Sequence, residues 1–349
     1  MENLFEYRRE MDSLRFSDEE KARLIGELAV SRPTARRRPV KRMVLVAAAL
    51  TAVLVVGAGA TGVLKNAVEV FSPLLGGSVA QTEVIDKIGR PIDAGDTDNG
   101  VTISADAIIG DRYNACIVYT IRRDDGTPLL PEGVTANQLL MGGTGGADLN
   151  VFCGTHGSSW FVDEDPADNK IQMIQTISAD RSLNNCTATA EFDGLRRWDD
   201  EAGQAVSLID GHWKFRFDVD FEDASVSLGG GETFEQGGMT FTITDVLVSP
   251  VAVRVEYEVD SAAAWIDAPS GQISDEDRRT QERYFEQVEI LLTKADGTVM
   301  DLSSSGGSIR PKVEKTRCIK GEVLDQVIPL EEMESLSVGG IVFPIQNNG

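Results

Sequence analysis

The sequence predicts a mainly β protein in which two tandem β-sandwiches follow one transmembrane helix and a short helical N-terminal segment. Three observations lead to this fold class: an uncharged apolar stretch, many short strand-like runs, and an internal repeat. The expected order is a cytoplasmic helical segment (1–42), a transmembrane helix (43–64), a stalk (65–92), a first sandwich (93–210) and a second sandwich (211–349).

The apolar stretch at residues 43–64 predicts a membrane-spanning helix. At about 1.5 Å per residue it would be roughly 33 Å long, enough for a hydrocarbon core of about 30 Å. Lys and Arg stay on the cytoplasmic side, which predicts an inner N-terminus, extracellular C-terminal domains and a single-pass protein of the cell membrane. The basic residues that set this topology are Arg36, Arg37, Arg38, Lys41 and Arg42.

Two alternatives exist for the apolar stretch. A cleaved signal peptide would need an n-region of about 42 residues, far longer than usual. Gly57, Gly59 and Gly62 spell the GxGxxG of a dinucleotide site. That motif requires a strand of ordinary length before it and a helix after it, whereas Pro73 follows soon here. Small residues in a membrane helix are the preferred interpretation, and no cofactor is expected.

The first 42 residues favour a partner-binding segment. Ser17 and Glu20 form a capping box, and an amphipathic face follows it. So short a segment cannot build its own core and needs a partner groove or a membrane surface. An anchor tail whose basic residues only set topology is the alternative. The expected partner-binding residues are Leu14, Leu24, Ile25 and Leu28.

The charge balance separates the two ends of the chain. Residues 1–42 carry 11 Lys and Arg against 8 Asp and Glu, a net charge of +3. Residues 65–349 carry 22 against 48, a net charge of −26. So acidic a surface repels polyanions, and we expect no direct nucleic-acid binding.

An internal repeat supports two similar sandwiches in tandem. Residues 100–121 align with residues 238–259 without a gap, at an offset of 138. Thr102 matches Thr240 and Tyr119 matches Tyr257, while the apolar alternation is kept. Runs rich in Val, Ile, Thr and Tyr between Gly and Asp turns are typical of β-sandwiches. One inserted helix is expected near residues 274–285, where Ser274 caps an acidic first turn.

Several of these segments together give a resemblance to a known family. FSDEEKARL, the Arg-rich anchor, TDNGVTISADAIIGDRYNACIVYTI, and WKFRFDVDF followed by GMTFTITDVLVSPVAVRVEYEV resemble bacterial proteins of domain-of-unknown-function family 4179. The resemblance implies immunoglobulin-like ectodomains, an anti-sigma-factor-like role and a cytoplasmic sigma factor as partner. It carries over no catalytic motif. The zinc-binding pattern common in cytoplasmic anti-sigma segments is absent, because no His or Cys precedes Cys116.

No catalytic or metal site is expected from the residues alone. His156 and His212 each lack a complete triad or ligand set, so structural roles are preferred. The acidic loops at 93–100 and 163–169 have incomplete calcium ligand sets and read as turns. Four cysteines allow three disulfide connectivities, of which Cys153–Cys186 is the preferred single pair.

Two functions compete. The first is a single-pass membrane regulator that couples the extracellular sandwiches, and an unknown extracellular ligand, to the cytoplasmic partner-binding segment. The alternative is a surface-displayed binding or adhesion module with an inert membrane anchor. An extracellular hydrolase is disfavoured, because no spacing specifies a carboxylate pair, and we expect no enzyme.

Overall fold

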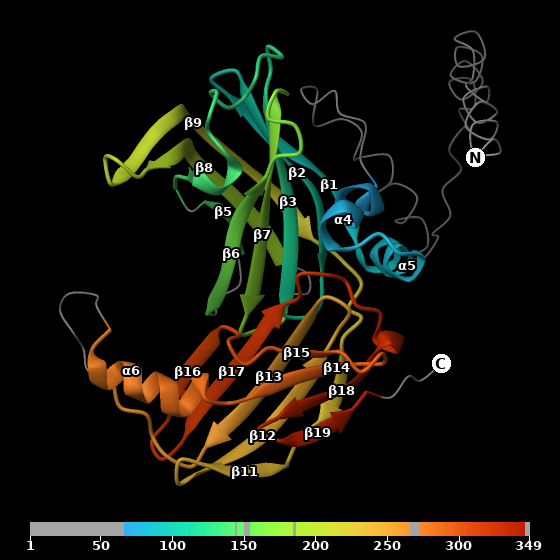
Figure 1. Cartoon of the computed structure of the whole chain (residues 1–349), viewed down its shortest axis with the longest axis vertical. Helices are drawn as coiled ribbons and strands as arrows, with labels where there is room; N and C mark the ends of the chain where they lie inside the picture. Colours follow the sequence, from blue (N-terminus) through green and yellow to red (C-terminus); the bar gives the residue numbers. More distant parts are fainter. Residues whose placement is uncertain (1–65, 144, 150–153, 184–185, 266–272, 346–349) are drawn as a thin grey trace, which may run out of the picture. The chain divides into compact units, whose positions relative to one another are not determined.

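The computed structural model describes residues 66–143, 145–149, 154–183, 186–265 and 273–345. All of them belong to one compact unit, Gly59–Gly349. Figure 1 shows this unit as mainly β, with several sheets and a few short helices.

The membrane part of the predicted fold class is corrected. Within the described ranges, no helix is long and apolar enough to cross a bilayer. The longest, α5 (Val79–Ile88), has 10 residues, or roughly 15 Å, about half of a hydrocarbon core. The predicted span (43–64) and the predicted helical segment (1–42) lie outside the described residues.

The first sandwich consists of two facing antiparallel sheets. One sheet has the order β1-β2-β3-β7-β6; in the other, β8 lies between β4 and β5 on one side and β9 on the other. A short 3₁₀ turn, η1 (Ala136–Gln138), precedes β4. The strands are β1 (Arg90–Asp98), β2 (Val101–Gly110), β3 (Asn114–Arg123), β4 (Leu139–Met141), β5 (Gly146–Leu149), β6 (Thr155–Val162), β7 (Lys170–Ala179), β8 (Cys186–Asp199) and β9 (Gln204–Val219).

The second sandwich has the same plan. Its sheets have the orders β10-β12-β13-β17-β16, with β11 also paired to β12, and β15-β14-β18-β19. A 3₁₀ turn, η3 (Leu330–Glu332), leads into β18. The strands are β10 (Val226–Gly229), β11 (Thr233–Gln236), β12 (Met239–Val248), β13 (Ala252–Val259), β14 (Ile290–Lys294), β15 (Val299–Asp301), β16 (Gly307–Pro311), β17 (Thr316–Val323), β18 (Met333–Val338) and β19 (Ile341–Pro344).

The sequence repeat is also a structural repeat. Strand β2 begins and ends 138 residues before β12, and β3 begins 138 residues before β13. The β-bulge between Ala105 and Ala107 recurs between Ile243 and Asp245, at the same offset. The β-rich fold is consistent with the immunoglobulin-like class. The strand order differs from that of immunoglobulin domains. The second and third strands of each copy pair within one sheet, whereas immunoglobulin strands B and C lie in different sheets.

Each sandwich has its own apolar core between its sheets. Tyr119 and Tyr257, which the repeat aligns, are both fully buried at the centres of the two cores. Each satisfies its hydroxyl: Tyr119 donates to Gln175 at 3.0 Å and Tyr257 donates to the carbonyl of Tyr284 at 2.8 Å. Buried aromatic rings with a satisfied polar tip contribute to core stability without leaving an unpaired group.

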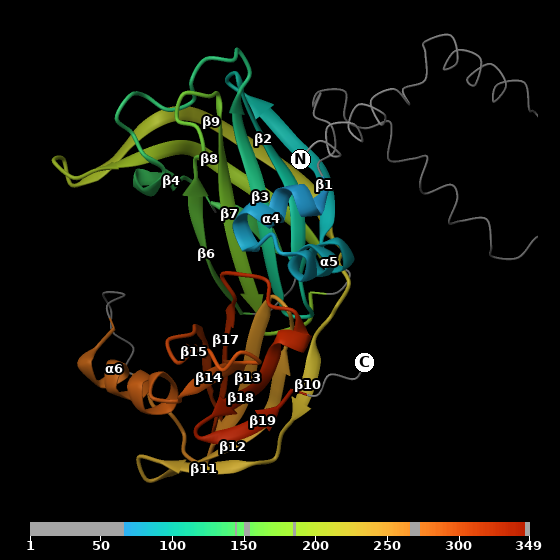
Figure 2. The same cartoon turned by 45° about the vertical axis from the view of Figure 1, so that its right-hand side comes forward.

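Residues 65–92, the predicted stalk, contain two helices that belong to the fold. Helix α4 (Ala67–Leu75) and helix α5 pack on the outer face of the first sandwich, beside β1, β2 and β3 (Figure 2). Ser78 and Gln81 form a capping box at the start of α5. Phe71 and Ile85 are fully buried there. This hydrophobic contact keeps the outer face of the sheet from water.

A third helix covers part of the second sandwich. Helix α6 (Asp275–Gln281) begins at its cap Ser274 and continues as the π-helical turn η2 (Glu282–Glu286). The ammonium of Lys320, on β17, donates to the carbonyls of Phe285 and Val288, both at 2.9 Å. These carbonyls lie at and just after the end of the turn, and the carbonyl of Phe285 also accepts from the backbone N–H of Val288 at 3.2 Å. Lys320 is fully buried.

Candidate functional site

The main candidate site is a cleft of about 900 Å³, which we call the β6 cleft. Its floor is the outer face of β6, β7 and β3, beyond the area that α4 and α5 cover. One wall is the end of α4, and the other is formed by residues 304–307 and 321–325 of the second sandwich. Binding clefts of this size, with mostly apolar walls and a few polar groups, are typical of ligand sites.

Strand pairing explains which side chains form the floor. In a strand, alternate side chains share a face. The even-numbered residues of β6 face the cleft beside their partners on β7, so that Ser158 lies opposite Thr176 and Trp160 lies opposite Ile174. The hydroxyls of Ser158 and Thr176 are 3.1 Å apart.

Trp160 gives the floor an exposed apolar surface. Its side chain remains 43% exposed, although large apolar residues in this sandwich are mostly buried. Ile174 beside it is buried, and Leu74 of the α4 wall is half-buried. A partly exposed tryptophan against an apolar floor offers a large contact area to a ligand.

Hydrogen bonds from the second sandwich hold the α4 wall in place. The carbonyl of Leu75, at the end of the helix, accepts from the backbone N–H of Val327 at 2.8 Å. The side-chain amide of Gln81 donates to the carbonyl of Val327 at 2.9 Å. The wall is therefore tied to both sandwiches, which fixes the width of the cleft.

His156 closes one end of the floor. Its ring lies under Gly306, where an added Cβ would come within 3.1 Å of the ring. Nε2 is buried without a hydrogen-bond partner among the described residues. Burial lowers the pKa of His156, with Arg254 adding to the effect and Asp180 opposing it. The ring is therefore neutral near pH 7 and serves as packing.

The chemistry of the lining favours binding over catalysis. Cys116 lies in the floor, but burial raises the pKa of its thiol to about 12, so it is protonated at neutral pH. Glu322 and Asp325 are exposed in the wall, and Glu322 accepts from the hydroxyl of Ser305 at 3.2 Å. The described lining contains neither Lys nor Arg. The β6 cleft is therefore apolar with an acidic wall.

The two sandwiches meet beside this cleft through their equivalent hairpin turns. Ser249 Oγ donates to Asp111 Oδ2 at 2.6 Å, and the two residues are 138 positions apart, so the repeat aligns them with each other. The other oxygen, Oδ1, accepts from the backbone of Tyr113 and from the backbone and side chain of Asn114. Burial raises the pKa of Asp111, although all four donors oppose that effect.

An arginine cluster adds a second set of contacts between the sandwiches. Arg254 donates to the carbonyl of Ala179 at 2.9 Å and to Glu256 at 2.7 Å, and its guanidinium lies 4.0 Å above the ring of Tyr113. Asp180 pairs with Arg310 on β16. Buried charges that are paired and hydrogen-bonded in this way fix the relative position of the two sandwiches.

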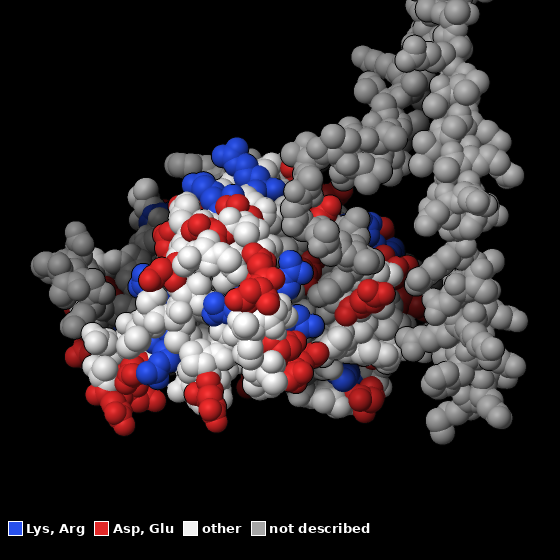
Figure 3. All heavy atoms as spheres, turned by 90° about the horizontal axis from the view of Figure 1, so that it is seen from above, with Lys and Arg blue, Asp and Glu red and all other residues white. Residues whose placement is uncertain are grey.

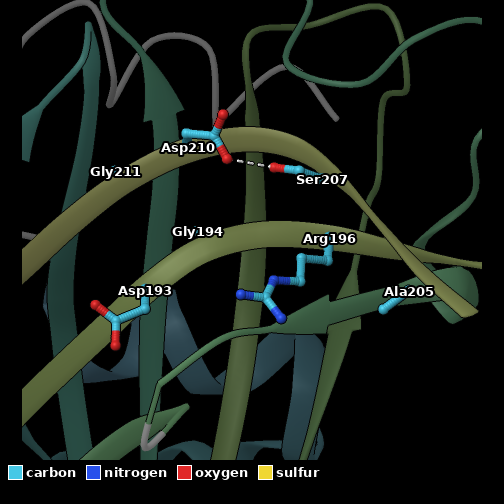
Figure 4. A pocket seen from close by; sticks show the side chains of 7 residues that line it. All are labelled: Asp193, Gly194, Arg196, Ala205, Ser207, Asp210 and Gly211. Carbon is cyan, nitrogen blue, oxygen red and sulfur yellow. Dashed lines mark hydrogen bonds between the residues drawn. The ribbon is translucent and has the colours of Figure 1, made fainter.

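A second hollow, of about 310 Å³, lies at the irregular part of the β8–β9 hairpin (Figure 4). Asp210 accepts from Ser207 at 2.6 Å, and Asp193 is 2.6 Å from His212 Nδ1. These are two separate pairs, since His212 and Ser207 share no hydrogen bond among the described contacts. The hollow therefore lacks the nucleophile–base–acid chain of a hydrolytic site.

The acidic loops serve the fold. Asp96 and Asp98 accept from the backbone N–H groups of Lys214 and His212 on β9, at 2.9 and 2.8 Å. These bonds join the edge strand β1 to the other sheet. Asp163 and Asp165 accept N–H groups of their own loop, at 163–168. Across the described residues, no group of three or more His, Cys, Asp or Glu side chains could hold a metal ion.

Few of the predicted site residues lie within the described part of the chain. Cys186 is buried at the start of β8, whereas Cys153 lies outside the described residues; the disulfide stays a prediction. Also outside are the partner-binding set (Leu14, Leu24, Ile25, Leu28) and the topology-setting set (Arg36, Arg37, Arg38, Lys41, Arg42). The sigma-factor partnership and the regulatory role stay predictions for the same reason.

Sequence reasoning missed the β6 cleft. Its lining comes from α4, two sheets and a loop that are far apart in the chain. One local signal was available. Ser158 and Trp160 lie on the same face of one strand, and a polar Ser158 there indicates that this face, and Trp160 with it, lies outside the sandwich core. A second local signal was the capping box of Ser78 and Gln81, which predicts the start of helix α5.

The surface agrees with the charge count. Figure 3 shows one face of the described surface, where acidic side chains are spread widely and basic ones occur singly among them and as one group at an edge. Such a distribution gives no continuous basic track for a phosphate backbone on this face.

Comparisons with known proteins add little. No family model and no curated protein matches the chain. One solved structure, described as the conserved domain protein from Bacillus anthracis, is similar over 72% of this chain and 76% of its own, with 18% identity and a TM-score of 0.45. This similarity is too weak to support a conclusion about the fold or the function of this chain. The resemblance to domain-of-unknown-function family 4179 therefore stays a prediction.

Proposed function

We propose that residues 66–345 form a non-catalytic recognition module whose ligand site is the β6 cleft. The observation that carries this proposal is a cleft of about 900 Å³ with an exposed tryptophan on its floor. An apolar hollow of this size is costly to leave in water, and covering it with a ligand recovers hydrophobic free energy.

The lining supports binding more than catalysis. The cleft's histidine is held as packing under Gly306, and its cysteine thiol is protonated at neutral pH. Neither is positioned as a general base or nucleophile. Two sets of contacts between the sandwiches, Asp111–Ser249 and the arginine cluster, support a preorganised site, which lowers the entropic cost of binding.

A dye titration of the full chain tests this function. Nile red, an uncharged apolar dye, should bind the wild type saturably at one equivalent. Thr176→Trp places an indole on the floor and should weaken binding at least tenfold. Val313→Trp, at a turn position that is 96% exposed, is the matched control and should bind as the wild type does.

Two results would contradict the proposal. One is the absence of saturable binding to the wild type. The other is equal binding to the Thr176→Trp variant, provided that its circular dichroism and thermal midpoint match those of the wild type. If Thr176→Trp does not fold, Ser158→Trp fills the same floor from the neighbouring strand and is judged by the same criterion.

A further inference from the structure

Strand β6 borders the β6 cleft and ends its sheet. In the order β1-β2-β3-β7-β6 it pairs with β7 alone among the described strands; the turn η1 contacts β6, and no described strand pairs with its other long side. Free edges attract other strands, so proteins usually protect them with Pro, Lys, bulges or short lengths. The eight residues of β6, THGSSWFV, contain neither Pro nor Lys, and their pairing with β7 has no register shift.

Four other edge strands among the described residues are protected. Strand β1, at the opposite end of the same sheet, carries Pro91 and a register shift beside it. Strand β16 ends in Arg310 and Pro311, β19 ends in Pro344, and β15 has three residues. The edge of β6 has none of the devices that protect these four strands.

The hydrogen-bond phase of β6 shows which backbone groups face outward. The N–H of Asp180 donates to the carbonyl of Gly154, and the N–H of Ser158 points to Thr176 Oγ1 at 3.3 Å on β7. Even-numbered residues thus direct their backbone groups to β7. Because antiparallel ladders alternate, the N–H and C=O groups of residues 155, 157, 159 and 161 point away from the sheet.

The side chains around the edge of β6 indicate which kind of ligand would bind there. A strand added beside β6 places its side chains about 5 Å from those of β6. One alternate set lies on the cleft face beside Ser158 and Trp160, and the other set lies on the opposite face of the sheet. The described lining has two exposed carboxylates, Glu322 and Asp325, and no basic residue. The acidic loop at 163–168 follows β6 directly, and Asp163 there has a raised pKa from burial and from its neighbours Asp165 and Asp168.

We infer that the ligand is an extended peptide with basic side chains on its cleft-facing side, which adds to β6 as a further strand of the sheet. This inference rests on the proposed function of the β6 cleft. At about 3.3 Å per residue the eight residues of β6 span roughly 26 Å. A peptide of six residues therefore pairs along most of this edge. Main-chain hydrogen bonds supply the affinity, and the cleft and its carboxylates supply the specificity.

Calorimetry on the full chain tests this inference with a defined hexapeptide, acetyl-Lys-Val-Lys-Val-Lys-Val-amide. It should bind at one equivalent, and its Glu counterpart should bind at least tenfold more weakly. Two N-methylated forms, methylated on the three Val or the three Lys nitrogens, should differ: one should lose binding, because an edge strand uses the N–H groups of one alternate set only.

Matched variants locate the binding to the edge and to the acidic wall. Ser159→Pro removes an outward N–H at a position where an edge strand tolerates proline, and it should abolish binding; Ser159→Ala keeps the N–H and should bind normally. Glu322→Gln combined with Asp325→Asn should weaken the Lys peptide at least fivefold. If Ser159→Pro fails to fold, the N-methylated peptides decide.

The outcomes separate this inference from the proposed function. Nile red binding without peptide binding overturns the peptide inference and leaves the recognition module intact. Equal binding by Ser159→Pro, or by both N-methylated peptides, also overturns it. A concentration-dependent dimer in sedimentation that Ser159→Pro abolishes would make a second copy the occupant, which contradicts the inference as well.

Discussion

Replacing the buried Lys320 should change the alkaline pH dependence of stability. Burial lowers the pKa of this lysine from 10.5 to about 8, while Glu286, Asp301 and Cys318 oppose the effect. Each tenfold change in proton affinity is about 1.36 kcal/mol, so the charged form is disfavoured in the folded state by about 3 kcal/mol.

The direction follows from proton linkage. Between about pH 8 and pH 10.5 the unfolded chain keeps the proton that the folded chain releases from Lys320. The free energy of unfolding therefore rises with pH across this window through this residue, by about 3 kcal/mol in total. Lys320→Met has no proton to release and lacks this contribution.

Urea denaturation at intervals from pH 7 to pH 10.5 measures the effect. Alkaline titrations of groups that do not interact with Lys320, such as the buried Cys116, are common to both proteins and cancel in the difference. The free energy of unfolding of the wild type minus that of Lys320→Met should rise by about 3 kcal/mol. Lys320→Arg keeps a charge throughout the window and should resemble Lys320→Met.

A difference that stays flat from pH 7 to pH 10.5 would refute the reasoning, since it would mean that Lys320 holds its proton equally in both states. A difference that falls with pH would refute it too. Lys312→Met, an exposed lysine of the same sandwich with 52% of its side chain accessible, controls for the general effect of removing a positive charge from an acidic protein.

Three further predictions concern the rest of the unit. Ser249→Ala should lower the free energy of unfolding by about 2–4 kcal/mol, because it leaves a carboxylate oxygen of Asp111 buried without its donor; calorimetric unfolding checks it, and a loss below about 0.5 kcal/mol would contradict it. The wild type should lose stability as the pH falls below 6.5 through the lowered pKa of His156, because the unfolded chain takes up a proton that the buried ring does not. His156→Gln should flatten this dependence in urea titrations from pH 7 to pH 5, and identical slopes would count against it. Trp213→Phe should cost about 1–3 kcal/mol, because the carbonyl of Val101 loses a buried donor at 2.8 Å; unchanged urea midpoints would exclude that role.

Much of the β architecture could be predicted from local sequence patterns. The offset of 138 between residues 100–121 and 238–259 reappears as matched strands with a shared bulge. Strand periodicity and turn residues are local, so they are legible in the sequence. Helix α5 was equally local in its capping box at Ser78, yet the proline and glycines around it suggested a stalk.

The chain's amino-acid order by itself determined the strands, the repeat and the acidic surface, because each depends on neighbours along the chain or on simple counting. Tertiary structure alone decided that β6 ends its sheet, that Trp160 stays exposed and that Asp111 meets Ser249. These features depend on which distant segments lie beside each other. Such contacts are set by the packing of whole sheets, which no local pattern encodes.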